Sequence, residues 1–286
     1  MKDGFEIVDG HVHTFSSAEV SKKIIDSFNK AYNIVFANPG TGTLEDVLEN
    51  MAASGVDYTI MANFAPPGIL HKNNLWTIEA SRLHKNLISL VSFHPEMEGS
   101  LRSFLEHYRN EGAKGVKLHP MAQGFNPLNE RLDEVYRSCG DIGFPIVFHC
   151  GRVANARLNE YSDANILEEI IAGYPETAFV LTHMADGNQE DVVRIAKSYP
   201  NVFFDTSIVI TGYPPLVETN EPSWLEDDQV VDVINTIGAD RVLFGSDYPW
   251  GSPLHDIGRI MGMKLTDVQK RLIFSQNSIR LFKLGD

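Results

Sequence analysis

The 286-residue chain alternates short apolar runs with amphipathic helical patterns from one end to the other. Several of the eight apolar runs are uninterrupted, as in Ala178-Phe179-Val180-Leu181. Such runs are typical of strands buried on both faces of a parallel sheet. The eight expected strands are Phe5–His13, Asp57–Asn63, Leu87–His94, Gly115–His119, Pro145–Cys150, Ala178–His183, Asn201–Thr206 and Arg241–Asp247.

Helical patterns fill the intervals between these strands. Thr43 is a candidate cap for Leu44–Ala53, which Gly55 can close, and Asn165 is a candidate cap for Ile166–Ala172. Long loops are expected at Thr14–Gly42, with a helix over Ser21–Ala31, and at Pro214–Asp228. The remaining expected helices are Asn74–Lys85, Leu101–Asn110, Glu130–Ser138, Asn188–Lys197, Asp227–Ile237 and Thr266–Leu284, the last with a break near Ser275.

Eight strands alternating with helices over this length predict a (β/α)₈ TIM barrel that forms one domain over residues 1–286. A doubly wound open sheet is the alternative. It is disfavoured because no Gly-x-Gly-x-x-Gly turn follows an early strand. In a barrel the long loops after the first and seventh strands lie over the mouth, where substrates bind.

Composition excludes several classes of partner. The net charge of -14 disfavours binding to a phosphate backbone, and no apolar run is long enough to span a membrane. The N-terminal residues lack the long apolar stretch of a secretory signal, and the two cysteines, Cys139 and Cys150, form no disulfide framework or spaced metal pair. We expect a cytoplasmic protein with a small-molecule substrate and no nucleic-acid or membrane partner; a homo-oligomer is left open.

Polar side chains collect where the expected strands end. Buried barrel strands usually carry Val, Ile and Leu, so imidazoles gathered at one rim are hard to explain by packing. His11 and His13 share one face of the first strand, because residues two apart point the same way. The residues at strand ends are His11, His13, His94, His119, His149, His183 and Asp247.

The order of the strands predicts a metal site. The eighth strand of a closed barrel neighbours the first, which places Asp247 beside His11 and His13, and the tip of the fifth strand brings His149 to face the same point. Three imidazole nitrogens and one carboxylate oxygen suit a divalent ion, most often Zn²⁺, with a position left for water. A bound ion lowers the pKa of water from about 15.7 towards about 7.

Two further residues are candidate substrate contacts. Arg152 follows the fifth strand, where its guanidinium could clamp a substrate carboxylate, although an exposed arginine on that loop is the alternative. His119 lies near the rim of the fourth strand and is expected beside the substrate. Lys117 shares its face, and a pairing with a barrel carboxylate is one interpretation of this lysine.

Four motifs, in this order along the chain, resemble the amidohydrolase superfamily. More narrowly, they resemble its amidohydrolase-related (amidohydrolase 2) family of metal-dependent TIM-barrel hydrolases and aromatic-acid decarboxylases. The closing Asn277-Ser278-Ile279-Arg280-Leu281-Phe282 is also similar to that family. The motifs are Asp9-Gly10-His11-Val12-His13, Phe148-His149-Cys150-Gly151, Leu181-Thr182-His183 and Phe244-Gly245-Ser246-Asp247-Tyr248-Pro249-Trp250.

The resemblance implies roles for these residues. His11, His13 and His149 match metal ligands, and Asp247 matches a ligand that also takes a proton from the nucleophilic water. His183 matches either a ligand to a second metal or a residue that orients or deprotonates the water. With two metals, Lys117 would be carboxylated and bridge them; one ion is favoured here.

The resemblance and the site lead to three functional hypotheses. The first is hydrolysis of an amide, lactone or ester C–N or C–O bond by metal-activated water, with Asp247 or His183 moving the proton. The second is non-oxidative decarboxylation of an aromatic or unsaturated acid at the same site. Some family decarboxylases place a glutamate before a single first-strand histidine, so the His-x-His pair favours hydrolysis. A non-catalytic metal-binding barrel is the third, disfavoured because each ligand position is filled.

Overall fold

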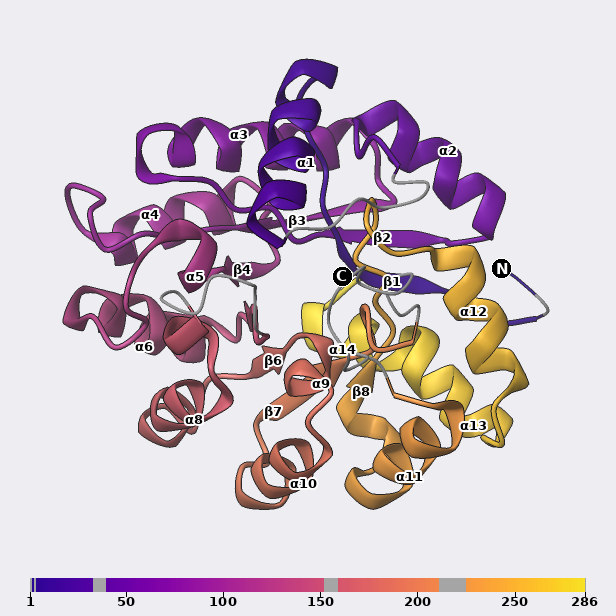
Figure 1. The fold of residues 1–286 in the computed structure, drawn as a ribbon. Helices are drawn as coiled ribbons and strands as arrows, with labels where there is room; N and C mark the ends of the chain where they lie inside the picture. The colour runs from indigo at the N-terminus through magenta and orange to yellow at the C-terminus, as the bar shows by residue number, and fades with distance from the viewer. Residues whose placement is uncertain (1, 3, 33–39, 152–158, 211–224, 286) are drawn as a thin grey trace.

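The computed structural model describes residues 2, 4–32, 40–151, 159–210 and 225–285, and Figure 1 shows their arrangement. Eight parallel strands follow one another in chain order, each paired with the next. This confirms the predicted (β/α)₈ barrel. The strands are β1 (Val8–Val12), β2 (Tyr58–Met61), β3 (Leu87–Val91), β4 (Gly115–Leu118), β5 (Ile146–Phe148), β6 (Phe179–Leu181), β7 (Val202–Asp205) and β8 (Val242–Leu243).

Backbone hydrogen bonds join the end of the chain's eighth strand to the first. The Gly10 N–H donates to the Phe244 carbonyl, and the Asp247 N–H donates to the His11 carbonyl, both at 2.8 Å. A parallel bridge between Val12 and Tyr248 continues this seam beyond β8. The seam brings Asp247 alongside the His-x-His pair, as the strand order predicts.

Helices surround the strands in Figure 1. Among the residues that the structure describes, no helix is both long and apolar enough to cross a membrane. Three short 3₁₀ turns, Glu130–Leu132, Glu160–Ser162 and Ala239–Arg241, complete the connections. The helices are α1 (Ala18–Tyr32), α2 (Leu44–Ser54), α3 (Pro67–Leu83), α4 (Leu101–Asn110), α5 (Pro120–Gln123), α6 (Asp133–Ile142), α8 (Ala164–Gly173), α9 (His183–Asp186), α10 (Gln189–Ser198), α11 (Asp227–Ile237), α12 (Pro253–Gly262), α13 (Asp267–Arg271) and α14 (Asn277–Phe282).

The capping predictions had mixed outcomes. Thr43 caps α2 through its side chain and Gly55 closes that helix in the left-handed conformation, both as predicted. The prediction for Asn165 was wrong, because the side chain of Asp163 accepts a hydrogen bond from the Asn165 N–H and caps α8. The final helical stretch breaks at a π turn, Leu272–Gln276, which includes Ser275.

Helix α12 (Pro253–Gly262) was not predicted from the sequence. Its Pro253 and its glycines are typical of a loop, yet proline is well suited to the first turn of a helix, where its missing N–H has no partner to lose. Ser252 caps this helix by accepting from the His255 N–H.

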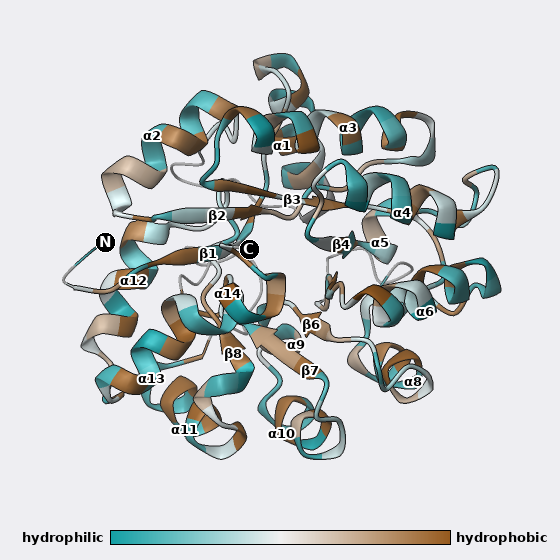
Figure 2. Ribbon diagram, turned by 180° about the vertical axis from the view of Figure 1, so that it is seen from behind, coloured by the Kyte–Doolittle hydropathy of each residue, from teal (hydrophilic) through white to brown (hydrophobic). Residues whose placement is uncertain are grey.

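The barrel interior is apolar at its amino end. The side chains there form one buried cluster, and α14 closes that end with Phe282. Figure 2, seen from behind Figure 1, shows α14 in front of the strands. The cluster contains Ala62, which directly follows β2, and the strand residues Val8, Ile60, Leu90, Val147, Val180 and Leu243.

One irregularity in β1 connects this apolar end to the polar one. Asp9 pairs with Thr59 and Val12 pairs with Met61, so β1 advances three residues while β2 advances two. An extra residue of this kind is a β-bulge, which shifts the alternation of side chains. The bulge lets Val8 face the apolar interior and His11, three residues later, face the barrel mouth.

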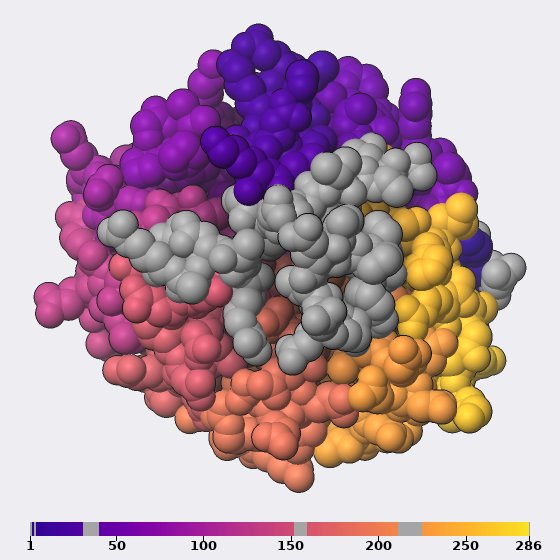
Figure 3. Space-filling view, viewed as in Figure 1, coloured from indigo at the N-terminus to yellow at the C-terminus, as the bar shows by residue number. Residues whose placement is uncertain are grey.

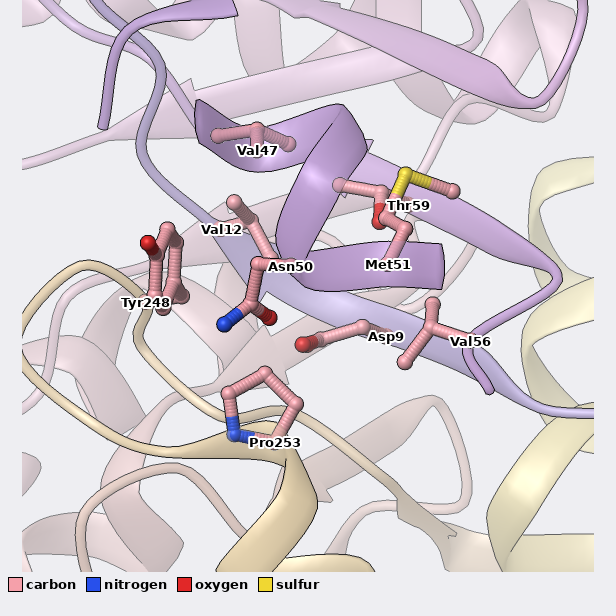
Figure 4. A pocket seen from close by; sticks show the side chains of 9 residues that line it. All are labelled: Asp9, Val12, Val47, Asn50, Met51, Val56, Thr59, Tyr248 and Pro253. Atoms are coloured by element: carbon pink, nitrogen blue, oxygen red, sulfur yellow. The ribbon is translucent and has the colours of Figure 1, made fainter. Parts of the chain in front are cut away.

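Asp9 precedes the bulge and directly follows the inward-facing Val8, so ordinary strand alternation places it on the outside of the barrel. Asp9 and Val12 line a small pocket between β1 and α2, where Figure 4 shows them facing Val47 and Met51. The Tyr248 side chain reaches the same pocket and donates a hydrogen bond to Asp46 at 2.6 Å. Tyr248 therefore packs outside the barrel and does not wall the mouth.

Candidate metal centre

Three residues from the two ends of the chain converge at the barrel mouth. His13 Nε2 lies 3.2 Å from His11 Nε2 and 3.2 Å from Asp247 Oδ1, and His11 Nε2 lies 3.4 Å from that oxygen. All three side chains are buried. These three predicted ligands form one cluster.

The spacing of these atoms fits a single divalent ion. Bonds of about 2.0–2.2 Å place tetrahedral ligand atoms about 3.3–3.6 Å apart and octahedral neighbours about 3.0 Å apart. The three measured separations, 3.2 to 3.4 Å, fall within that span. Two imidazole nitrogens and a carboxylate oxygen are electron-rich, so this close approach is favourable when a cation neutralises their repulsion.

The fourth predicted ligand, His149, lies outside this cluster. Its Nδ1 is 3.2 Å from His183 Nε2, and its ring stacks on His119 with centroids 3.7 Å apart. His149 Nε2 is buried and has no hydrogen-bond partner among the described residues. A buried nitrogen without a partner is costly unless something binds it, so His149 retains a free ligand atom.

Burial keeps these imidazoles neutral. Burial, together with the charge of Lys117, lowers the pKa of His11 to about 4 against the opposing charges of Asp205 and Asp247. The pKa values of His13, His119 and His149 are likewise lowered, chiefly by burial. Neutral imidazole is the form that binds metals. The site is therefore ready to accept an ion without first releasing protons from these rings.

Lys117 lies at the base of the centre. It is fully buried on β4, and its Nζ is 3.2 Å from His11 Nε2. Burial lowers its pKa to about 8, although Asp205 and Asp247 favour the charged form. Among the described residues, the hydrogen-bond partner of Lys117 Nζ is the His11 imidazole. The structure therefore does not show the direct pairing with a barrel carboxylate that was one interpretation of this lysine.

Asp205 is a site residue that sequence analysis missed. It ends β7, it is buried, and its Oδ2 lies 2.9 Å from His11 Nδ1. It forms a second potential ligand cluster with His11 and His183. The available signal was an acidic residue near the end of the predicted strand Asn201–Thr206, to which no chemistry had been assigned.

Asp9 is the second residue that was missed, although its motif had been noted. Its carboxylate accepts from the Ser246 N–H at 2.9 Å and from the Ser246 hydroxyl at 2.6 Å. Burial raises its pKa to about 7 against these hydrogen bonds. Because Ser246 precedes Asp247, Asp9 ties the strand that carries the His-x-His pair to the loop that carries Asp247.

The backbone from His183 to Asp186 is in the left-handed conformation. Four successive non-glycine residues, His183 to Asp186, have φ between 43° and 62°, and Gly187 continues the run. Each such residue costs roughly 1–2 kcal/mol in an L-amino-acid chain. The His183 N–H is held by Asp205 at 2.8 Å, which anchors the start of this turn.

Aromatic side chains surround the centre on the side of α1. Phe64 packs on His119 with centroids 4.5 Å apart and edge-on to His13 at 5.7 Å. Trp250 packs edge-on to His13 at 5.2 Å and stacks on Phe28 of α1 at 4.4 Å. Figure 3 shows α1 in indigo over this face of the molecule. The aromatic edges offer contacts for a flat substrate.

His94, a further histidine at a predicted strand end, and His71 on α3 both make contacts outside the ligand cluster. His94 Nε2 contacts the Gln123 carbonyl at 3.2 Å, and its Nδ1 accepts from the Glu96 N–H, so it holds a loop. His71 contacts the Tyr108 hydroxyl at 2.7 Å. Arg152, the predicted carboxylate clamp, lies outside the described residues.

Comparisons with known structures agree with this fold. A 5-carboxyvanillate decarboxylase from Novosphingobium aromaticivorans, complexed with manganese and a nitrobenzoic acid, superposes with a TM-score of 0.74 at 17% identity, covering 99% of this chain and 97% of that one. A 2,6-dihydroxybenzoate decarboxylase complexed with 2,6-dihydroxybenzoate gives 0.72 at 15% identity, covering 98% and 100%.

A third structure, provisionally assigned as a 2-pyrone-4,6-dicarboxylic acid hydrolase from Pseudomonas putida, gives a TM-score of 0.69 at 16% identity, covering 99% of each chain. At these identities the likeness shows a shared fold. A search of curated proteins gives no significant match.

A sequence model of the amidohydrolase family matches residues 8–284, nearly the whole chain. The matched span contains the His-x-His pair, His149, His183 and Asp247. This confirms the family resemblance of the motifs, and the chain belongs to the amidohydrolase family.

Proposed function

We propose that this protein is a metal-dependent, non-oxidative decarboxylase of an aromatic or unsaturated carboxylic acid. This reverses the order of the two enzyme hypotheses from the sequence. The His-x-His pair had favoured hydrolysis, whereas two of the three similar structures described above are decarboxylases of benzoic acids. One of them holds manganese, so Mn²⁺ joins Zn²⁺ as a candidate ion.

The observation that carries the proposal is the mixture of charge and aromatic surface at the centre. A divalent cation together with protonated Lys117 would outweigh the charges of Asp205 and Asp247 by one unit. A site with net positive charge attracts a carboxylate. Phe64 and Trp250 present ring edges beside His13, where they can pack against a flat ring.

The ligands would be His11, His13 and Asp247, with His149 Nε2 available as a further donor. When bound, the divalent ion would supply the positive charge that draws the substrate's oxygens into the centre. Phe64 and Trp250 exclude water from one side of that space, and Lys117 Nζ, which contacts His11 Nε2 in the metal-free structure, would give up that nitrogen to the ion.

Asp247 is the group proposed to move the proton. In the reaction the bond between the ring carbon and the carboxylate carbon breaks, CO₂ leaves, and the electron pair remaining on the ring carbon takes a proton. Contacts with His11 and His13 lower the pKa of Asp247 despite its burial, so its carboxylate is ionised and must take up a proton from solvent before passing it to the ring carbon. His183 Nε2 is already engaged by His149. Asp247 is therefore better placed than His183 to carry the proton to the substrate.

Hydrolysis remains the second candidate function, and the complete His-x-His pair is the observation that favours it. The same centre could orient a water molecule against a lactone or amide carbonyl, with Asp247 accepting its proton. The Pseudomonas putida structure that is provisionally assigned as a hydrolase has the same fold.

A substrate screen in D₂O separates the two functions. The manganese- and zinc-loaded proteins are incubated with hydroxybenzoates and related acids, and separately with lactones and amides. We expect CO₂ release and one deuterium on the carbon that lost it, both absent from Asp247→Asn. Cleavage of lactones or amides without CO₂ release from any acid would replace the proposal with hydrolysis.

A further inference from the structure

The Asp205 carboxylate collects hydrogen bonds from three separate parts of the barrel. Its Oδ1 accepts from the backbone N–H groups of His183 at 2.8 Å and Ser207 at 3.1 Å, and from the Ser207 hydroxyl at 2.5 Å. Its Oδ2 faces His11 Nδ1 at 2.9 Å. An ionised carboxylate only accepts hydrogen bonds. Every group that contacts Asp205 must therefore direct a proton towards it.

The first consequence concerns His11. Since Asp205 accepts, the proton of the His11 ring lies on Nδ1, and Nε2 carries the lone pair. An independent contact requires the same tautomer, because the Lys117 ammonium can only donate and lies 3.2 Å from Nε2. His11 is thus fixed in the form in which its Nε2 can bind a cation beside His13 and Asp247.

The second consequence concerns Ser207 and His183. The single hydroxyl proton of Ser207 points to Asp205, so its oxygen accepts from His183 Nδ1 at 2.8 Å. His183 Nδ1 also faces the Ser207 carbonyl at 3.2 Å, which is another acceptor. His183 is therefore protonated on Nδ1, and its Nε2 carries a lone pair.

The third consequence reaches His149. The His183 Nε2 lone pair faces His149 Nδ1 at 3.2 Å, so His149 Nδ1 carries the proton and donates it. That leaves the lone pair of His149 on Nε2, the buried atom that has no partner among the described residues. The chain of contacts from Asp205 thus ends on a nitrogen that is free to bind a ligand.

We propose that Asp205 is a positioning residue that sets the tautomers of His11, His183 and His149 together, so that His11 Nε2 presents its lone pair to the metal centre and His149 Nε2 keeps a lone pair free for a ligand. The role of Asp205 in metal binding rests on the proposed metal-dependent function, whereas the tautomer assignment rests only on the hydrogen bonds. Hydrogen bonds of this kind from outside the ligand set fix ring orientation, and their loss typically weakens metal binding about 10–100-fold.

Asparagine at position 205 is the informative substitution. Its amide keeps the size of the carboxylate but offers N–H donors as well as one acceptor oxygen. When the amide N–H faces His11, the proton must move from Nδ1 to Nε2, which blocks the ligand atom. Asp256→Asn is the matched control, because Asp256 is also a fully buried aspartate but lies on α12 beside His255.

The direct test is nitrogen NMR of the full-length, metal-free protein labelled with ¹⁵N-histidine, in which the two neutral tautomers give different ring patterns. Single His→Gln variants assign each ring. In the wild type we expect His11, His183 and His149 all protonated on Nδ1. This test needs no Asp205 variant, so it stays decisive even when Asp205→Asn fails to fold. A wild-type His11 or His149 protonated on Nε2 overturns the proposal.

The second readout is the affinity for Mn²⁺ and Zn²⁺, measured by competition with a chelating dye. We expect Asp205→Asn to bind each ion about 10–100-fold more weakly and to change the His11 pattern, while Asp256→Asn matches the wild type. Equal affinities and equal tautomers in the two variants overturn the proposal. A wild type that binds neither ion would refute the proposed function instead, and the NMR result would still decide the role of Asp205.

Discussion

The two ends of the barrel interior are built from the same strands but have opposite chemistry. On β5, Val147 belongs to the apolar cluster at the amino end, and His149, two residues later, belongs to the polar centre. On β1 the change from Val8 to His11 needs an extra residue, supplied by the bulge. The amino end of the barrel is filled by aliphatic side chains and Phe282, whereas the mouth holds buried histidines, aspartates and a lysine.

The residues at the amino end of the barrel therefore stabilise the fold, whereas those at the mouth serve the proposed function. A fully buried aliphatic side chain stabilises the fold by about 1.5–3 kcal/mol. A buried charge costs free energy unless hydrogen bonds or an opposite charge compensate it. The mouth therefore depends on the amino end for its stability. The positive φ values from His183 to Asp186 add strain at the mouth.

The largest effect is expected from Asp247→Asn at the polar end. Turnover in the substrate screen should fall about 10²–10⁴-fold, because the amide cannot carry the proton. The fold should persist, as judged by circular dichroism and thermal unfolding. Asp256→Asn serves again as the buried control and should keep its activity. Activity of Asp247→Asn within tenfold of the wild type would remove Asp247 from the proposed role.

Next in size is Leu90→Ala at the apolar end. Leu90 is fully buried in the interior cluster, so its truncation should lower the free energy of unfolding by about 2–5 kcal/mol. Metal affinity should stay within threefold of the wild type, since the interior cluster to which Leu90 belongs contains none of the proposed ligands. The control is Leu83→Ala, which is 67% exposed and should change stability by less than about 0.5 kcal/mol. A large loss of metal affinity in Leu90→Ala would mean that the two ends are coupled.

A smaller effect of opposite sign is expected from Lys117→Met. Removing this buried charge should raise the free energy of unfolding of the chelator-treated protein by about 1–3 kcal/mol in urea titrations at pH 7. Lys85→Met, at an exposed lysine, should leave it unchanged. A destabilised Lys117→Met protein would mean that the lysine holds the metal-free centre together.

The difference in stability between the wild type and Lys117→Met should depend on pH. The pKa of Lys117 is lowered from 10.5 to about 8, so the unfolded chain binds the proton more tightly. The wild type should therefore gain stability as the pH rises from about 8 to about 10.5, and the advantage of Lys117→Met should shrink over that interval. A constant difference between the two proteins across this interval would contradict the lowered pKa.

The smallest effect is expected from Ala185→Gly in the left-handed turn. Glycine adopts positive φ without strain, which offsets the flexibility that it adds to the unfolded chain. Thermal unfolding should show a change below about 0.5 kcal/mol. Ala52→Gly on α2 should cost about 1 kcal/mol, because its backbone is helical. Equal losses in the two variants would show that the turn is not strained.

Much of the fold and part of the centre could be predicted from the sequence. Apolar runs and helical periodicity are local properties, so they gave the eight strands and, through strand order, the approach of Asp247 to His11 and His13. The missed α12 and the misplaced cap at Asn165 are also local: the proline and glycines of α12 are typical of a loop, and Asp163 lies only two residues before Asn165.

By itself, then, the sequence determined the barrel, its polar mouth and three of the four predicted ligands as one cluster. Only the tertiary structure decided the bulge in β1, the partner of His149 and the place of Asp205. His11 and Asp205 are 194 residues apart, and their contact exists because barrel closure brings β1 and β7 to the same rim. Periodicity tells which face a side chain occupies, whereas its hydrogen-bond partner depends on the packing of every strand between them.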